Sequence, residues 1–179
     1  MDCIGEKVKI ISLEQGTCTD IACQYFVKNI FKKNAEIVYV SSYPELEKLA
    51  KKEKNSLVLL PHINPLCIKL EHDPKWKTQV DLKFSLQNPP IYLAKNGLQK
   101  QNNFCATIPI LQQLIKPTDL VFVSAKNTQN AAEIAKKGAC TFCITNENGI
   151  KKTNLIIIKE LKKILVTWIP FCYIGNLSK

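Results

Sequence analysis

Five short segments of this 179-residue chain carry side chains suited to binding or converting a small anion. In chain order they are Gly16-Thr17-Cys18-Thr19, Pro61-His62-Ile63-Asn64, Thr107-Ile108-Pro109, Asn127-Thr128 and Val166-Thr167-Trp168. Each follows a predicted strand end and offers hydroxyl groups, amide groups or the start of a helix. Because a helix start carries unpaired N–H donors and partial positive charge, it binds carboxylates or phosphates without arginine. We therefore expect these segments to line one small-anion site.

The hydroxyl and amide candidates also have a structural interpretation. Thr17 and Thr19 are typical helix caps. Asn64 precedes a proline and suits a turn. Asn127 and Thr128 favour a helix cap over an anion-binding site. Capping and ligand binding are compatible at one residue, so both interpretations stay open.

Two candidates concern catalysis. His62 is the one side chain beside a motif that titrates near physiological pH, so it is a candidate proton donor. A lone histidine after a strand is equally compatible with a bystander role. Thr167 is either a catalytic hydroxyl or a β-branched residue that favours a strand.

The charge balance argues against a nucleic-acid partner. The formal net charge is +10, yet no arginine occurs anywhere in the chain. Arginine is the preferred group for phosphates and base edges, and the lysines are dispersed in pairs such as Lys32-Lys33 and Lys136-Lys137. The pattern predicts a solvated, lysine-rich surface, with a field that attracts anionic metabolites as the alternative.

No segment predicts a membrane span or a targeting signal. The longest apolar runs, such as Leu57–Pro61, are far shorter than the ~20 residues that a membrane helix needs. Met1–Lys7 lacks the basic start and apolar run of a signal peptide. We expect a cytoplasmic protein without membrane contact.

The eight cysteines are expected to be reduced thiols, several of them buried. They stand at positions 3, 18, 23, 67, 105, 140, 143 and 172. Cys140 and Cys143 form a C-x-x-C pair, but both histidines lie far upstream, so a zinc site is not expected. Ala139–Thr145 alternates like a strand, which places the two sulfurs out of redox geometry. We predict neither metal nor cofactor.

The first third of the chain predicts a parallel sheet with helical crossovers. Three β-rich runs, Lys7–Leu13, Glu36–Val40 and Ser56–Leu60, alternate with helical patterns over Thr19–Lys32 and Pro44–Lys52. Strand–helix–strand spacing of this kind is typical of right-handed βαβ units.

A proline-rich crossing, Asn88-Pro89-Pro90, separates this set from a second one. The alternating run Lys77–Leu86 precedes the crossing. Beyond it we expect strands at 91–94, 104–107, 120–124, 139–145 and 154–158, helices at 109–115 and 127–137, and a returning strand at 163–169. The pattern predicts an α/β fold of two lobes, with residues 1–88 plus 163–179 in one lobe and residues 89–162 in the other.

At these motifs the chain resembles the catalytic domain of prephenate dehydratases and the prephenate decarboxylases of the bacilysin pathway. Gly16-Thr17-Cys18-Thr19 is similar to the family's Gly-Thr-Phe-Ser loop after the first strand. The run Val58–Asn64 is similar to a Val-Pro-Ile-Glu-Asn stretch and keeps Pro61 and Asn64.

The later motifs continue the resemblance, which spans roughly residues 8 to 172. Thr107-Ile108-Pro109 resembles a Ser-His-Pro segment in which Ile108 replaces the histidine. Asn127-Thr128 opens a segment similar to a Ser-Thr-x-x-Ala-Ala helix start. Val166-Thr167-Trp168 falls where dehydratases carry Thr-Arg-Phe and the decarboxylases carry a Val-Trp pair.

The resemblance implies a two-lobed fold of the type II periplasmic-binding-protein kind, with the ligand cleft between the lobes. It also implies a prephenate-like cyclohexadienyl dicarboxylate as ligand and a role in aromatic amino acid or antibiotic biosynthesis. With the residue analysis it gives Thr167 and His62 as candidate catalytic residues. The candidate substrate-binding residues are Thr17, Thr19, Asn64, Thr107, Asn127, Thr128 and Trp168.

Three functions stay open. The leading hypothesis is a carbon–carbon lyase of the non-aromatising prephenate decarboxylase kind, because Trp168 replaces the family's arginine and the resemblance includes no regulatory domain. Thr167 favours the alternative, a dehydratase that forms phenylpyruvate. The missing arginine and histidine favour a non-catalytic binding or sensing module with the same cleft. The oligomeric state is open, with a homodimer as one option.

Overall fold

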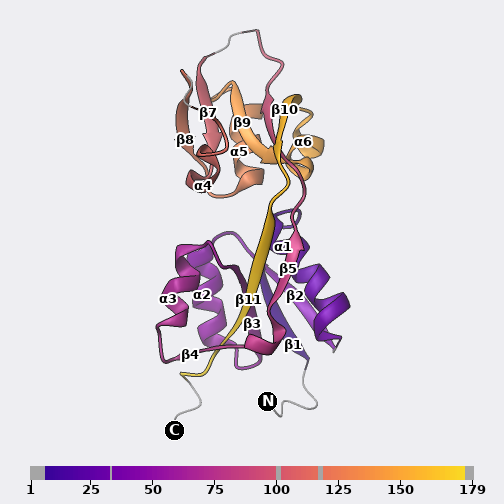
Figure 1. Ribbon diagram of the computed structural model, residues 1–179, viewed down its shortest axis with the longest axis vertical. Helices are drawn as coiled ribbons and strands as arrows, with labels where there is room; N and C mark the ends of the chain where they lie inside the picture. Colours follow the sequence, from indigo (N-terminus) through magenta and orange to yellow (C-terminus); the bar gives the residue numbers. More distant parts are fainter. Residues whose placement is uncertain (1–6, 33, 100–101, 117–118, 176–179) are drawn as a thin grey trace. The chain divides into compact units, whose positions relative to one another are not determined.

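The structure is a computed structural model that describes residues 7–32, 34–99, 102–116 and 119–175 (Figure 1). Cys3 and the rest of the stretch before Lys7 lie outside the described residues. The chain divides into two compact units: the first comprises Met1–Leu86 and Leu165–Lys179, and the second comprises Gln87–Ile164. Each unit has its own sheet and core.

The first unit contains a mixed sheet in the order β2-β1-β3-β11-β4, with β5 also paired to β11. Its strands are β1 (Val8–Leu13), β2 (Ala35–Val40), β3 (Ser56–Pro61), β4 (Trp76–Thr78), β5 (Phe84–Gln87) and β11 (Leu165–Tyr173). Its helices are α1 (Cys18–Tyr25), η1 (Phe26–Phe31), α2 (Tyr43–Lys52), α3 (Pro65–Glu71) and the short η2 (Val80–Leu82). β1 runs parallel to β2 and β3, whereas β11 runs antiparallel to β3 and β4.

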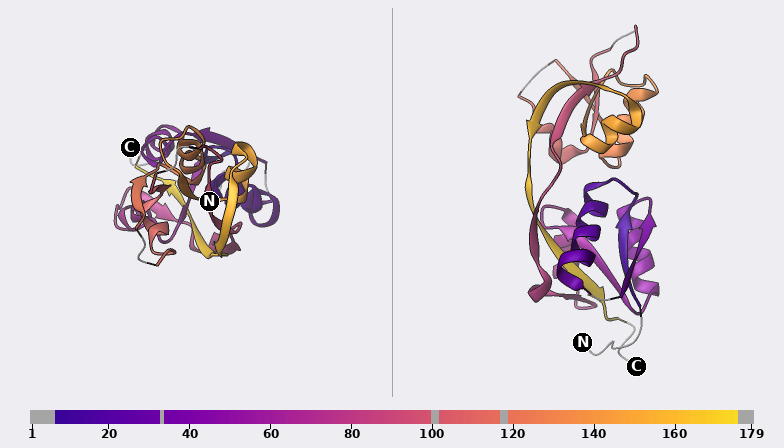
Figure 2. Two further views of the ribbon diagram at one scale, coloured as in Figure 1. Left: turned by 90° about the horizontal axis from the view of Figure 1, so that it is seen from above. Right: turned by 90° about the vertical axis from the view of Figure 1, so that its right-hand side faces the viewer.

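The helices of the first unit cover both faces of its sheet (Figures 1 and 2). On one face, Leu46 of α2 and Leu70 of α3 pack against Val58 and Phe171 in a closed apolar core. On the other face, α1 and η1 bury Ala22, Cys23 and Phe26, and the Phe26 ring stacks on Phe84 at 5.8 Å. The sheet is therefore buried on both sides, which explains why its central strands are apolar runs rather than alternating ones.

The second unit contains a sheet in the order β10-β6-β9-β7-β8. Its elements are β6 (Ile91–Lys95), β7 (Phe104–Thr107), α4 (Pro109–Gln112), β8 (Val121–Ser124), α5 (Thr128–Lys136), β9 (Phe142–Asn146), α6 (Glu147–Thr153) and β10 (Ile156–Lys162). β7 runs parallel to β8 and β9, and β6 runs antiparallel to β9 and β10.

Small residues let the helices of the second unit approach its sheet closely. Ala131, Ala132 and Ala135 of α5 are fully buried. At Gly149 of α6 a Cβ atom would collide with Thr145 Oγ1 of β9 and would lie 3.2 Å from the Ala132 Cβ. The small residues thus set how α5, α6 and β9 pack.

The element predictions require several corrections. The helix predicted over Thr19–Lys32 begins at Cys18 and turns π-helical from Phe26, ending at Lys32 in the left-handed region (φ 51°). The predicted run Lys77–Leu86 is divided into β4, η2 and β5, because a short helix at Val80–Leu82 interrupts it.

The C-x-x-C region also differs from the strand predicted over Ala139–Thr145. β9 begins only at Phe142, so Cys140 precedes the strand. The backbone N–H of Thr141 binds the Asn102 side chain at 2.9 Å instead of a neighbouring strand. The helices α3 and α6 were not predicted at all.

Candidate functional site

The candidate residues of the first unit gather at the carboxyl edge of its parallel strands. Thr17 and Thr19 follow β1, and Asn64 follows β3. Trp168 of β11 pairs with Pro61, the last residue of β3, so Thr167 and Trp168 reach the same edge. Parallel strands bring their carboxyl ends together, which explains this grouping.

A buried carboxylate, which the sequence analysis missed, occupies the start of α1. Thr17 caps the helix, accepting a hydrogen bond from the Asp20 N–H at 3.2 Å. The Asp20 side chain in turn accepts from the Gly16 N–H at 2.8 Å and from the Tyr39 hydroxyl at 2.9 Å. Gln24 Nε2 donates to the same carboxylate at 3.0 Å. The start of α1 therefore already holds a negative charge that belongs to the protein.

The start of α5 in the second unit repeats this hydrogen-bond pattern without the charge. Asn127 caps α5, accepting from the Asn130 N–H at 2.8 Å. Asn130 Oδ1 accepts from the Lys126 N–H at 3.1 Å, as Asp20 accepts from Gly16 in the first unit. Because Asn130 is neutral, the partial positive charge of α5 is not offset by its own capping partner.

A cluster of uncharged polar groups lies at the edge of the first unit. The Thr19 and Tyr43 hydroxyls are 3.5 Å apart. Burial raises the pKa of Tyr43, and hydrogen bonds with Thr19 and Asn64 only partly offset that rise. Asn64 also caps α3, its Oδ1 accepting from the Leu66 N–H at 2.8 Å. The cluster can exchange hydrogen bonds with a polar ligand while it stays neutral. Sequence reasoning missed Tyr43.

The two candidate catalytic residues meet through the backbone. The His62 N–H donates to the Thr167 carbonyl at 2.9 Å, while the His62 side chain is exposed. The Thr167 hydroxyl lies 3.1 Å from the Ser85 hydroxyl of β5. The structure thus adds Ser85 to the predicted pair.

Trp168 occupies a different environment from Thr167. Ile169 and Phe171 belong to the core beneath α2 and α3, so strand alternation puts Trp168 on the opposite face of β11. Its side chain is 1% exposed, and its indole N–H lacks a hydrogen-bond partner among the described residues. Thr167 and Trp168 therefore point away from one another.

The remaining candidates lie at the carboxyl ends of the parallel strands β7 and β8 in the second unit. Thr107 ends β7 with its buried hydroxyl donating to the Ile108 carbonyl at 3.2 Å. The Thr128 carbonyl accepts from the Thr145 hydroxyl at 2.7 Å, which ties the start of α5 to β9. The expectation that the candidates of both units serve one ligand stays a prediction.

Five of the seven described cysteines are buried and two are half-buried. None of the seven is disulfide-bonded, and burial raises the pKa of Cys23, Cys105 and Cys143 to about 12. Within residues 7–32, 34–99, 102–116 and 119–175, no three His, Cys, Asp or Glu residues are grouped to hold a metal ion. Thiols of this kind behave as small apolar side chains.

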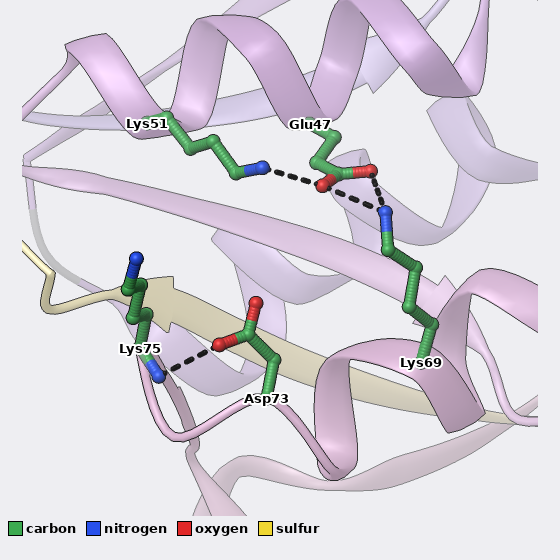
Figure 3. Close-up of polar contacts among 5 residues, drawn as sticks. All are labelled: Glu47, Lys51, Lys69, Asp73 and Lys75. Carbon is green, nitrogen blue, oxygen red and sulfur yellow. Dashed lines mark hydrogen bonds and ion pairs between the residues drawn. The ribbon is translucent and has the colours of Figure 1, made fainter.

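A separate cluster of charged side chains joins α2 to α3 (Figure 3). The Glu47 carboxylate pairs with Lys51 Nζ at 2.6 Å and with Lys69 Nζ at 2.9 Å. Burial acts to raise the pKa of Glu47, but the two lysines outweigh it and hold that pKa below its ordinary value. Beside them, the Lys75 N–H binds Asp73 at 2.9 Å and closes a turn. With both oxygens engaged by lysines, Glu47 is a structural group rather than a base.

Comparison with known proteins shows the fold. Neither a family model nor a curated protein sequence matches the chain. Among solved structures, prephenate dehydratase from Arthrobacter aurescens, in complex with L-Phe, matches with a TM-score of 0.62 at 8% identity. The match covers 93% of this chain and 60% of that protein.

Two further structures show the same likeness. The methionine-binding protein MetQ matches with a TM-score of 0.59 at 13% identity, covering 96% of this chain and 85% of that one. Prephenate dehydratase from Staphylococcus aureus subsp. aureus Mu50 matches with a TM-score of 0.57 at 14% identity, covering 92% and 66%. The predicted two-lobed α/β fold of the periplasmic-binding-protein kind is confirmed. At such low identities the likeness to prephenate dehydratases extends to the fold alone. In the described part of the chain, no helix is long and apolar enough to cross a membrane.

Proposed function

We propose that this protein binds a small carboxylate-bearing metabolite, with the carboxylate at the start of α5. The observation that carries the proposal is the neutral capping partner Asn130, which leaves the N-terminal charge of α5 available to an anion. One structure of the same fold is a methionine-binding protein, and methionine carries a carboxylate. The prephenate-like dicarboxylate that the family resemblance implies belongs to the same class.

The polar cluster of Thr19, Tyr43 and Asn64 in the first unit can itself exchange hydrogen bonds with a polar metabolite. Two groups at this edge, Asp20 and His62, could act as an acid or a base, but their surroundings favour catalysis less than binding. Asp20 is held by donors from three residues, and the His62 side chain is exposed. Binding is therefore the function proposed first.

The test is isothermal titration calorimetry with prephenate, L-Phe and L-Met. Asn130→Asp gives α5 the charge that α1 already carries, so the affinity for a bound carboxylate should fall about tenfold through like-charge repulsion. The helix itself should be stabilised by about 0.3–1 kcal/mol, because an acidic residue in the first turn is favourable. Asn29→Asp, an exposed change of equal charge in the first unit, is the control and should have little effect.

Two results would contradict the proposal. If none of the three compounds binds saturably, the protein does not bind this class. If one binds and Asn130→Asp leaves its affinity unchanged, the carboxylate is not held at the start of α5.

A lyase that acts on prephenate is the second candidate. It is favoured by the Thr167 and Ser85 hydroxyls, which lie 3.1 Å apart beside the exposed His62. A dehydratase must assist the departure of the ring hydroxyl while the ring carboxylate leaves as carbon dioxide, and a hydroxyl pair can donate to that oxygen. A non-aromatising decarboxylase keeps the hydroxyl and delivers a proton to a ring carbon, for which His62 is the candidate source. Mass spectrometry of prephenate incubated with the protein distinguishes phenylpyruvate, a decarboxylated dihydro product and unchanged prephenate.

A further inference from the structure

A cavity of about 400 Å³ lies at the amino edge of the first unit's sheet, the edge opposite the candidate site. It is formed where α2 ends and where β1 and β3 begin, and the Lys9 N–H binds the Asn55 carbonyl there at 2.9 Å. The lining residues are Lys7, Lys9, Lys52, Glu53, Lys54 and Asn55.

The cavity carries an excess of positive charge. Four lysines face one glutamate, which leaves three positive charges in excess. Lys9 Nζ pairs with Glu53 at 2.7 Å, and Lys7 Nζ pairs with Glu36 outside the lining at 2.6 Å. Lys52 and Lys54 are exposed, and no ion pair joins either of them to another described residue. Two ammonium groups therefore remain for an external anion.

Helix electrostatics explain only part of this arrangement. A lysine in the last turn of a helix interacts favourably with the helix dipole, which accounts for Lys52. Lys7 directly precedes β1, Lys9 lies in β1 and Lys54 lies in the turn before β3, so the dipole of α2 does not explain them. Their convergence on one cavity is the feature that points to a ligand.

We propose that this cavity binds a compact polyanion with adjacent phosphoryl groups, such as a free oligophosphate or the phosphate chain of a nucleotide. Ligand pockets span about 300–1,000 Å³, so this cavity has room for more than one phosphoryl group. Its lining holds neither apolar nor aromatic side chains, which suits a ligand made of charge alone. Lysine binds phosphate as a point charge, without the planar geometry that arginine imposes.

Glu53 opposes the ligand in this arrangement. Its carboxylate holds Lys9 and raises the pKa of that lysine chiefly through their hydrogen bond. Replacing Glu53 by glutamine frees Lys9 and removes the one negative charge of the lining. Substitutions at Glu53 and at the lysines should therefore change the affinity in opposite directions.

The test is calorimetric titration with sodium tripolyphosphate at about 0.15 M ionic strength and without divalent cations, because charges more than about 8 Å apart are then largely screened. We expect saturable binding that weakens about tenfold in the double variant Lys52→Gln/Lys54→Gln. The matched control is Lys136→Gln/Lys137→Gln, which removes the same charge from the end of α5 and should change the affinity less than about twofold. Lys54→Arg keeps the charge and should keep binding, and unchanged thermal unfolding verifies that each variant is folded.

Glu53→Gln should tighten binding severalfold, whereas Glu147→Gln, which removes the partner of Lys151 on α6, should not. Equal effects of the cavity variants and of their controls would overturn the proposal, because they would reflect net charge alone. Absence of saturable binding would overturn it as well, and so would citrate binding as tightly as tripolyphosphate. If ATP matches tripolyphosphate, the source is a nucleotide; if only tripolyphosphate binds, the source is a free oligophosphate.

Discussion

The helices α1 and α5 begin with the same pattern of capping hydrogen bonds and differ in one charge. In both, a capping side chain accepts from the residue three positions on, whose own side chain reaches back to the N–H before the cap. In α1 that returning side chain is the Asp20 carboxylate, and in α5 it is the Asn130 amide. One capping arrangement thus neutralises a helix start in the first unit and leaves it positive in the second. A helix N-terminus predicts an anion site only when its capping partner is known to be neutral.

The two units also differ in their thiols, and this contrast gives the largest expected effect. The described cysteines of the second unit are all buried, whereas Cys18 and Cys172 of the first unit are half-buried. For Cys105 and Cys143, burial raises the pKa from 9.0 to about 12, so their thiolate fraction falls about a thousandfold. In iodoacetamide labelling followed by peptide mass spectrometry, Cys18 and Cys172 should react first among the seven described cysteines.

Labelling in urea is the control for that prediction, since all thiols should then react at similar rates. Fast labelling of Cys143 in the native protein would mean that the core of the second unit opens readily.

The second test removes the capping partners themselves. Asp20→Ala removes the carboxylate that accepts hydrogen bonds from the Gly16 N–H and the Tyr39 hydroxyl, so the free energy of unfolding of the first unit should fall by about 3 kcal/mol. Asn130→Ala, the matched change in α5, should cost about 1 kcal/mol. Both tryptophans, Trp76 and Trp168, lie in the first unit, so fluorescence in a urea titration reports that unit alone.

Asn130→Ala should therefore leave the fluorescence transition in place and shift only the circular dichroism transition. If both variants shift the fluorescence transition equally, the two units unfold together and the comparison of helix starts fails in this assay.

The smallest expected effect concerns the ion pairs of the two units. Glu47→Gln should lower the free energy of unfolding by about 1 kcal/mol at neutral pH, because Glu47 is nearly buried between two lysines. Glu147→Gln in the second unit breaks an exposed pair with Lys151 and should cost about 0.3 kcal/mol.

The pH dependence of Glu47 follows from its lowered pKa. Its contribution is present above the ordinary pKa of glutamate and is lost as the pH falls through the lower pKa of the folded state. Urea titrations across acidic pH should show the wild-type protein losing more stability than Glu47→Gln. Parallel pH curves would mean that the two lysines contribute nothing to folding through Glu47.

Much of the first unit could be predicted from its sequence, because local signals specify it. The β-branched runs and the helical periods place β1, α2 and β3 within a residue or two. The cap at Thr17, and the cap at Asn127 in the second unit, likewise follow from residue type. The signal for α3 was also local, since Asn64 followed by Pro65 is a cap and a favoured first helical residue.

The roles of Asp20 and Tyr43 could not be predicted in the same way. The hydrogen bonding of Asp20 on α1 depends on Tyr39, which lies on β2. Tyr43 belongs to the polar cluster only because Thr19 and Asn64 lie beside it in the folded protein. Such contacts arise from the packing of elements that are distant in sequence. The same holds for Trp168, whose face of β11 depends on which neighbouring residues enter the core.

The order of strands has a consequence for how the protein is made. β11, the last strand of the chain, pairs with both β3 and β4 inside the first unit's sheet. Until residues 165–173 have been synthesised, the first unit lacks β11, and the edge of β3 that pairs with β11 is unpaired. The second unit is contiguous in sequence and can fold as soon as its own residues emerge. The amino-terminal part of the chain is therefore synthesised first and completed last, and its unpaired strand edge is the place where a chaperone would be needed during translation.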